Sequence, residues 1–398
     1  MVTVKALDQV TPADLWREIK ADVDDDFWQE AQTKQRQLLK TFLEGALEEE
    51  MVDLLAAGRY RRTEARVGYR NGFYERDLIT QFGIISGLRV PRRRSGEGES
   101  AVFSHYQRRQ AQVDVLIREV FLAGVATRRV GEVLQAVLGT AVSAQTVSRV
   151  TSRLNREVAR FHATALADDV RYLFLDGVSL RVKTAAGMKR RMVLCAYAIS
   201  IVGERRVLDF RLANSESQLN WEAFLNQLRE RGLRGQHLLL IATDGCPGLH
   251  AALGTVYPYV KRQHCWAHKL RNVANLLKRS QQEECLAEAK LIYQAETRAA
   301  AIKAFWSWAR KWREPAPKAV ACLEKDIEDL LSFLSCPPAQ RRKIRTTNVI
   351  ERCFREVRRR TRPMTCFNNP ESCERIIFAV LSHLNAGWKG HALPEFTH

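Results

Sequence analysis

Cysteine is absent before Cys195, and none of the nine cysteines forms a Cys-x-x-Cys pair. This odd, late set argues against a disulfide framework, so we expect reduced thiols. No apolar stretch reaches the roughly 18 residues that a membrane-spanning helix requires. Residues 1–20 also lack the charged-then-apolar order of a signal peptide. We therefore expect a cytoplasmic protein with no membrane contact.

Acidic residues are outnumbered by basic ones. The 398 residues contain 63 Lys and Arg against 45 Asp and Glu, a net charge of +18, which indicates a polyanionic partner. Residues 341–362 hold ten basic side chains but only two acids, Glu351 and Glu356. This stretch is typical of a surface that contacts phosphates, although such a run can also be a solvated face. The length predicts two or three structural units.

The N-terminal part divides into three predicted segments. An amphipathic acidic helix fits 35–55 and belongs to a helical region at 1–58 with an oligomerisation or DNA-binding role. A small basic β element fits 59–94, because Asn71-Gly72 and isolated glycines separate short β-prone runs. Residues 95–100, rich in Gly, Ser and Glu, read as a linker that completes the segment 59–100.

Residues 101–160 predict a helix-turn-helix-like DNA-binding domain. Three short helical patterns follow one another, with Gly139 at a C-cap position and Ser143 as the N-cap of the third. That third helix exposes Gln145, Arg149 and Arg153, which could contact base edges and phosphates in the major groove. An ordinary three-helix packing unit is the alternative.

From residue 168 the pattern becomes α/β. Three β-prone runs at 171–176, 192–201 and 206–212 favour an antiparallel meander. A helix follows at 218–231, then a strand at 237–243 and a helix at 247–253. Another strand fits 259–263, and a last helix runs up to 277. This order is typical of a ribonuclease H-like core, whose first part we place at 168–279. An all-helical insertion is predicted at 280–340, and the last part of the core, with C-terminal helices, at 341–398.

Two isolated carboxylates lie on the predicted strands. Asp176 is within or at the end of the first strand, and Asp244 ends the most apolar one. A charged side chain in a core strand is unfavourable unless it is paired or bound to a metal. Turn chemistry explains either residue alone, but two on neighbouring strands favour two-metal catalysis with Mg²⁺.

Glu351 is the predicted third carboxylate, at the start of a basic helix. With Asn348 as N-cap, its spacing also fits a capping box, which needs no catalysis. Glu356, on the other side of the helix, is the alternative third ligand. The side chains predicted to hold DNA phosphates along this helix are Arg355, Arg358, Arg359 and Arg362.

Cys265-x-x-His268 suggests zinc when it is considered together with Cys246 and His250. The second pair falls beside Asp244, where four ligands would compete for space, so packing or a DNA contact is the preferred interpretation. Lys269 and Arg271, which follow the motif, are predicted DNA contacts. His264 is interpreted as a polar residue at a strand end.

Several motifs together resemble the Mutator-type transposases of bacterial insertion sequences. Shorter matches occur at 68–72, at 90–92 and at Trp388, so the resemblance spans nearly the whole chain. The longer motifs are Arg171-Tyr-Leu-Phe-Leu-Asp176-Gly177, Ile241-Ala-Thr-Asp244-Gly245, His264-Cys265-Trp266-Ala-His268-Lys269-Leu-Arg271-Asn272 and Thr346-Thr347-Asn348-Val-Ile-Glu351-Arg352. Cys246-Pro247 after Asp244 is a local departure.

The resemblance implies a ribonuclease H-like domain with the triad Asp176, Asp244 and Glu351, interrupted by a helical insertion. It implies strand cleavage and transfer with two Mg²⁺ ions, which Mn²⁺ can replace, and no nucleotide cofactor. The expected partners are double-stranded DNA, as element ends and as target, and a second copy in a homodimer. The expected location is the bacterial cytoplasm, at the nucleoid when DNA is bound. The alternatives are a metal-dependent DNA nuclease without strand transfer and a sequence-specific DNA-binding regulator.

Overall fold

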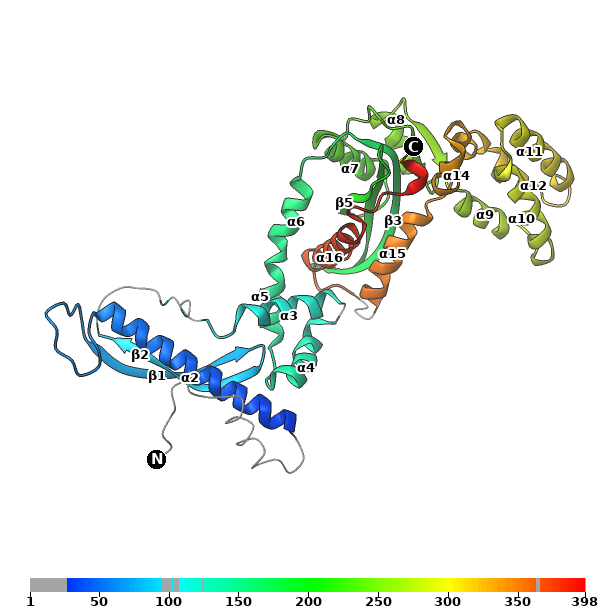
Figure 1. Ribbon diagram of the computed structural model, residues 1–398. Coiled ribbons are helices and arrows are strands. Elements are labelled where there is room, and N and C mark those ends of the chain that lie inside the picture. The colour runs from blue at the N-terminus through cyan, green and yellow to red at the C-terminus, as the bar shows by residue number, and fades with distance from the viewer. Residues whose placement is uncertain are drawn as a thin grey trace. The chain divides into compact units, whose positions relative to one another are not determined.

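The computed structural model describes residues 27–94, 100, 102, 107–123, 125–362 and 366–397 (Figure 1). The chain forms two compact units, Met1–Thr151 and Ser152–His398, and has a mixed α/β architecture. Residues 1–20, the predicted linker apart from Ser100, and Pro363, which follows the basic helix, lie outside the described residues. Within the described part, no helix has both the length and the apolar character to cross a membrane.

The first unit contains a long helix, which begins earlier than the predicted 35–55, packed against a basic hairpin. Leu47 of the helix contacts a cluster of Leu78, Ile85 and Leu88 from the two antiparallel strands. The Asn71-Gly72 pair is not the hairpin turn: it lies inside the first strand, at a register irregularity. These elements are α2 (Phe27–Leu55), β1 (Arg70–Thr80) and β2 (Gly83–Arg93).

Three helices complete the first unit. Gly139 ends the second in the left-handed conformation, with φ of 66°, and the Ser143 hydroxyl accepts a hydrogen bond from the Thr146 N–H at the start of the third. The third ends at Ser152, and a separate helix begins at Leu154. The helices are α3 (Ala111–Leu122), α4 (Thr127–Leu138) and α5 (Ala144–Ser152), and α6 (Leu154–Ala163) follows in the second unit.

The second unit is built on a five-stranded sheet of order β5-β4-β3-β6-β7. β3, β4 and β5 form the predicted antiparallel meander, whereas β6 and β7 run parallel to β3. All four residues of β6 are buried, which accords with its sequence of three apolar residues and one threonine. The strands are β3 (Val170–Thr184), β4 (Gly187–Ser200), β5 (Arg205–Ala213), β6 (Leu240–Thr243) and β7 (Lys261–His264).

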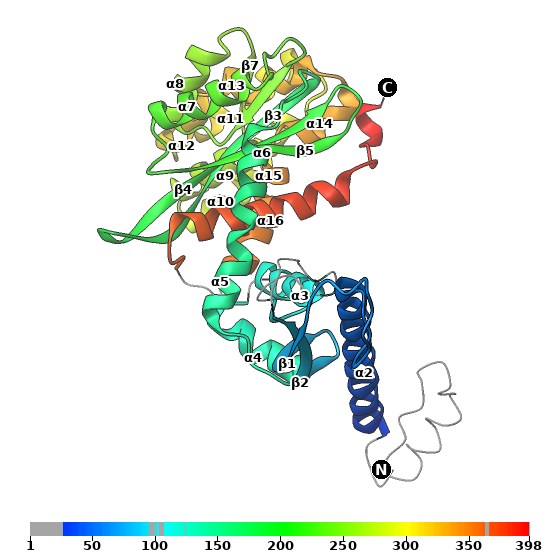
Figure 2. The same cartoon turned by 90° about the vertical axis from the view of Figure 1, so that its left-hand side faces the viewer.

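Helices cover both faces of this sheet (Figure 2). On one face Leu173 and Leu175 of β3 pack with Trp221 and Leu249 from the helices that flank β6. On the other face Tyr172 meets Phe396 and Tyr197 meets Trp388, in edge-to-face ring contacts. The first pair of helices is α7 (Gln218–Glu230) and α8 (Pro247–Val256). The second layer contains α6, α15 (Asn348–Thr361), α16 (Pro370–Trp388) and the 3-10 turn η4 (Pro394–Phe396).

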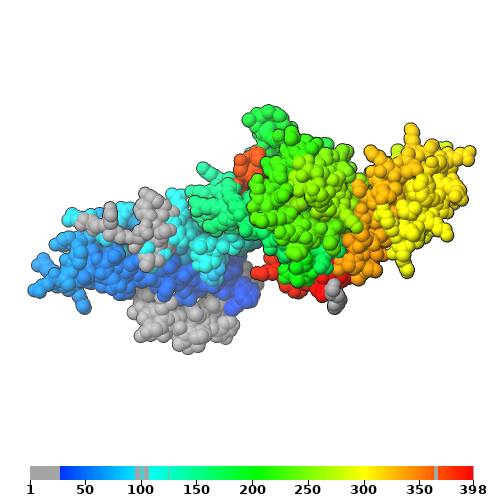
Figure 3. Space-filling view, turned by 90° about the horizontal axis from the view of Figure 1, so that it is seen from above, coloured from blue at the N-terminus to red at the C-terminus, as the bar shows by residue number. Residues whose placement is uncertain are grey.

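Between β7 and α15 the described chain is entirely helical, as predicted. In the space-filling view the yellow part of this segment forms a lobe beside the green sheet region of the second unit (Figure 3). Its interior contains Phe305, Trp308 and Trp312, from the aromatic cluster in the sequence. The elements are α9 (Trp266–Asn275), α10 (Arg279–Gln294), α11 (Arg298–Trp312), α12 (Pro317–Glu324), α13 (Ile327–Leu330), η2 (Ser332–Ser335) and α14 (Pro338–Ile344).

One buried carboxylate ties the sheet to the helices around it. Asp209 of β5 is completely buried, and its side chain is bonded to Arg231, at the end of α7, and to His162 Nδ1 of α6 at 2.6 Å. Arg231 also donates to the Phe161 and Thr164 carbonyls of the α6 end, at 3.0 and 2.8 Å. Since Asp209 is completely buried and the Arg231 side chain is only 9% exposed, this ion pair is protected from solvent screening.

We predict that Arg231→Met destabilises the second unit by about 3 kcal/mol, because it leaves the Asp209 charge buried with one partner fewer. Urea unfolding followed by tryptophan fluorescence measures this change. Arg234→Met, three residues further along and on the surface, is the matched control and should change the free energy of unfolding by less than about 0.5 kcal/mol. Equal effects of the two substitutions would contradict the role assigned to Arg231.

Candidate functional site

Asp176 lies in the middle of the central strand β3. It pairs with Cys195 of β4 and is 6% exposed. Alternation along the strand puts its side chain on the same face as Tyr172 and Phe174, which is the face covered by α15 and α16. Its Oδ1 accepts a hydrogen bond of 2.8 Å from the N–H of Gly177.

Asp244 directly follows β6, the strand next to β3 in the sheet. Because Phe174 pairs with Ala242, the parallel register brings positions 176 and 244 alongside one another. The Asp244 carboxylate accepts a hydrogen bond of 3.0 Å from the N–H of Cys246, and α8 begins at Pro247. The local Cys246-Pro247 departure therefore leaves the acid at the strand end and starts the helix normally.

The pKa of Asp176 depends on the charges of the other acids. Burial, followed by the negative charge of Asp244, raises the pKa of Asp176 from 3.8 to about 7. The Gly177 hydrogen bond and the nearby His268 act in the opposite direction, while the charge of Glu351 adds to the increase. Asp176, Asp244 and Glu351 are thus close enough for each charge to affect the same carboxyl group.

Glu351 reaches the site from α15, but not through a capping box. The N-cap of α15 is Thr347 rather than Asn348, and its side chain makes no capping hydrogen bond, so the predicted capping box is wrong. The Glu351 carboxylate instead lies 3.3 Å from His268 Nε2 and accepts a hydrogen bond of 3.0 Å from Arg271 Nη2. Its position is therefore explained by tertiary contacts to α9.

The Cys-x-x-His motif holds the start of α15. Cys265 Sγ accepts a hydrogen bond from the Thr347 N–H, and His268 Nδ1 lies 3.3 Å from the Thr347 hydroxyl. Burial opposes ionisation of Cys265, but hydrogen bonds from His268 and Thr347 outweigh it and lower the pKa of the thiol. The hydrogen bond to Cys265 correspondingly raises the pKa of His268. The motif thus supports the helix that carries Glu351.

The two Cys/His pairs do not form one site. Cys246 Sγ donates to the Glu216 carbonyl at 3.6 Å, away from the Cys265 and His268 contacts. Among the described residues, no group drawn from both pairs brings its ligand atoms within 4.8 Å of one another. The four-ligand zinc site weighed from the sequence is therefore not formed.

Glu216 is an additional acid that the sequence patterns did not reveal. Burial and the charge of Asp244 raise its pKa. A Cβ at Gly177 would collide with the Glu216 carboxylate, so glycine next to Asp176 leaves the space that this side chain occupies. The only sequence signal was a glycine immediately after the first Asp, which fits a turn equally well.

The predicted DNA-contacting side chains divide into exposed and buried ones. Lys269 is only 9% exposed and is bonded to Asp326 and to the Cys322 carbonyl, so the expectation that it contacts DNA does not fit. The exposed ones are Gln145, Arg149, Arg153, Arg271, Arg355, Arg358, Arg359 and Arg362. Arg358 and Arg362 line a basic cleft of about 400 Å³ together with Arg181 of β3.

Glu356 points to a different environment from Glu351. Its carboxylate accepts a hydrogen bond of 2.7 Å from Arg360 and lies 3.8 Å from Arg359, both on its own helix. The charges that chiefly shift the pKa of Asp176 include that of Glu351 and not that of Glu356. Glu351 is therefore the acid of α15 that the fold brings to Asp176.

We predict that metal-free protein becomes less stable as pH rises from about 4 to above 7. Folded Asp176 keeps its proton up to about pH 7, whereas the unfolded chain loses it near 3.8, so the folded state binds more protons in this window. Asp176→Asn should reduce this decrease and stabilise the protein at pH 8. Thermal unfolding in chelator at pH 5 and pH 8 measures both effects. The control Glu204→Gln, at an exposed acid, should keep the parent's pH dependence; the same pH dependence in Asp176→Asn would contradict the prediction.

Comparison with known proteins agrees with the motifs. The family described as "Transposase, Mutator family" matches residues 14–391. The chain is 34% identical over 353 residues to the "Transposase for insertion sequence element ISRM5" of Rhizobium meliloti, covering 89% of this chain and 88% of that protein. Identity to the "Transposase for insertion sequence element IS406" of Burkholderia multivorans is also 34% over 353 residues, covering 88% and 90%.

A more distant relative is the "Transposase for insertion sequence element IS256 in transposon Tn4001" of Staphylococcus aureus, 29% identical over 356 residues, or 89% of this chain and 90% of that one. The family match covers most of the chain, and two relatives exceed 30% identity across nearly their full length. The family resemblance inferred from the sequence is confirmed. The chain belongs to the Mutator family of transposases.

Proposed function

We propose that this transposase cuts the DNA ends of an insertion sequence and joins them to target DNA, using Asp176, Asp244 and Glu351. One observation carries the proposal: three acids from distant parts of the sequence approach one another beside the central strands. The strand order and the helical segment between the second Asp and the Glu support a ribonuclease H-like catalytic domain.

The donor set fits two Mg²⁺ ions, which Mn²⁺ can replace. All three side chains offer hard carboxylate oxygens, and the repulsion that raises the pKa of Asp176 is relieved by a nearby divalent cation. When bound, the ions supply charge stabilisation for the attacking and leaving oxygens of an in-line displacement. The chain needs no nucleotide cofactor for this chemistry.

The protein itself binds and orients the DNA. His268 and Arg271 fix the Glu351 carboxylate, and Arg271 remains 58% exposed, so it can also reach a phosphate. Arg358, Arg362 and Arg181 around the basic cleft would hold the strand beside α15. These contacts position the scissile phosphate without forming a covalent link to the enzyme.

Recognition of the element ends belongs to the first unit in this proposal. Gln145 and Arg149 are exposed on α5, as expected for a helix that reads the major groove after a turn, and Arg153, which follows α5 at the start of the second unit, is exposed as well. In the hairpin, the Arg89 guanidinium lies over the Phe73 ring, and its charge adds to the basic surface of this unit. A homodimer would bring two inverted ends together, since both must be processed.

The test is a nicking and joining assay on supercoiled DNA that carries the element ends, with Mg²⁺ or Mn²⁺. Asp176→Asn, Asp244→Asn and Glu351→Gln should each reduce cleavage at least about 100-fold, because each removes a charged ligand, while DNA binding is kept. Glu356→Gln, on the same helix but paired with Arg360, is the matched control and should stay within about twofold of the parent.

Other results would point to different functions. Cutting without joining would make the chain a nuclease. Binding without any cutting under either metal would make it a DNA-binding regulator. An active Glu351→Gln together with an inactive Glu356→Gln would transfer the third ligand to Glu356.

Glu216 is proposed as a supporting acid beside Asp244. Glu216→Gln should raise the Mg²⁺ concentration required for half-maximal cleavage by about 10-fold, since neighbours of metal ligands affect metal affinity on that scale. Gly177→Ala should act in the same direction, because its methyl group displaces the flexible Glu216 side chain. Titration of cleavage rate against Mg²⁺ measures both, and an unchanged midpoint in both variants would exclude Glu216 from the site.

A further inference from the structure

A second cluster of ligand side chains lies in the same unit and shares no residue with the three acids. His264 ends β7 and is 7% exposed, and within the described part of the chain neither of its ring nitrogens makes a hydrogen bond, although both are enclosed. A buried polar side chain without a partner is unfavourable and rare in native proteins. The ring therefore indicates a ligand that is not part of the polypeptide.

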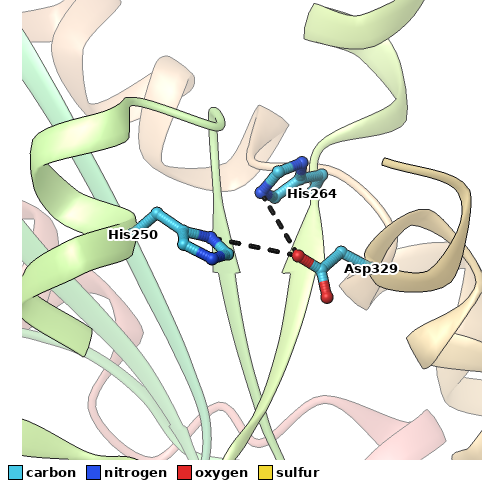
Figure 4. Close-up of side chains that lie close together, drawn as sticks. All are labelled: His250, His264 and Asp329. Carbon is cyan, nitrogen blue, oxygen red and sulfur yellow. Dashed lines mark ion pairs between the residues drawn. The ribbon is translucent and has the colours of Figure 1, made fainter. Parts of the chain in front are cut away.

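Two other side chains are directed at this ring (Figure 4). Asp329 of α13 places Oδ2 3.6 Å from His264 Nε2, and the same oxygen lies 3.9 Å from Nδ1 of His250 on α8. One ligand atom from each of the three residues lies within 4.8 Å of the others. Tetrahedral Zn²⁺ with N and O ligands separates its donor atoms by about 3.4 Å, so only a small contraction is needed.

We propose that His250, His264 and Asp329 bind one Zn²⁺ ion, with water in the fourth position. Two imidazoles and one carboxylate form a nitrogen-rich set that suits Zn²⁺ and disfavours Mg²⁺, the ion expected at the three acids. Asp326 Oδ2 lies 3.7 Å from the other nitrogen of His264, where it can accept the ring N–H and orient the ligand.

Solvent reaches the cluster through an open cavity of about 530 Å³ lined by His250, Asp329 and Arg262. Arg262 donates to His250 Nε2 at 2.8 Å, which leaves the ring proton on Nδ1, facing Asp329. Binding of Zn²⁺ at Nδ1 requires that proton to move to Nε2, and the Arg262 contact must then break. Arg262 therefore competes with the ion, and its removal should strengthen binding.

The proposed ion would join three elements of the second unit. It would link the helical segment, through α13, to the edge strand β7 and to α8 after Asp244. Binding would stabilise the folded chain by mass action and hold the segment against the sheet. The role is structural, so it does not depend on the chemistry of the three acids.

The experiment uses full-length protein, stripped with chelator and then titrated with Zn²⁺ in the absence of DNA. Elemental analysis should find one tightly bound equivalent of Zn²⁺, and thermal unfolding should show that Zn²⁺ raises the melting temperature.

The variants test each ligand. His250→Asn and Asp329→Asn, at partly exposed positions, should each weaken Zn²⁺ binding at least about 10-fold. His264→Gln should do the same, and Arg262→Gln should bind more tightly than the parent. His237→Asn, at an exposed histidine elsewhere, should match the parent.

Cobalt distinguishes this cluster from the neighbouring Cys265 and His268. Co²⁺ bound at the proposed site should give ligand-field absorption without the charge-transfer band of a thiolate ligand. The proposal is overturned if the parent retains no Zn²⁺, if His250→Asn and Asp329→Asn keep full affinity, or if only Cys265→Ser loses the ion. An unchanged affinity in Arg262→Gln would remove His250 from the ligand set. Because no DNA is present, failure of the cleavage proposal cannot produce any of these results.

Discussion

The second unit depends on one unfavourable contact: two carboxylates on adjacent parallel strands, in a place from which most water is excluded. Burial disfavours the charged form of Asp176, and the negative charge of Asp244 disfavours it further. Together they raise the pKa of Asp176 to about 7. A sheet designed only for stability would place apolar residues at both positions. Two neighbours moderate this repulsion, the Gly177 N–H and the nearby His268, whereas the charge of Glu351 adds to it. The strain is local, because Leu173, Phe174 and Leu175, which precede Asp176 on β3, are apolar and fully buried.

The sequence revealed the parts of this arrangement that depend on periodicity. Three of the four β6 residues are apolar and the fourth is Thr243, because both faces of the strand are covered, so the acid that follows it stands out. The meander of β3, β4 and β5 was predictable from the spacing of its strands, because connections this short can join only antiparallel neighbours. The strand was expected to begin at 237, but β6 begins at Leu240, although the Leu239 N–H already donates to the Arg171 carbonyl of β3 at 2.9 Å.

Tertiary contacts could not be read in this way. Glu351 satisfied the spacing of a capping box, but its helix begins one residue earlier, with Thr347 as N-cap, and its real partners are on α9. Lys269 looked like one more basic residue in a positive motif, while the fold buries it against Asp326. Glu216 had no local pattern at all, since its approach to the site depends on the missing side chain of Gly177. In each case the deciding partner is distant in sequence, so periodicity carries no information about it.

The helical segment matters to the site because of where it attaches. β7 is the edge strand, and an uncovered edge exposes unpaired backbone groups. Here α13 and η2 cover it: buried Gln263 donates to the Leu330 carbonyl at 2.9 Å and accepts from the Phe333 N–H at 2.7 Å, and the Trp266 ring N–H donates to the same Leu330 carbonyl at 2.7 Å. The segment thereby fixes the β7 end, from which α9 emerges. Since α9 carries the two side chains that contact Glu351, a segment with no acid of the triad still determines where the third acid lies.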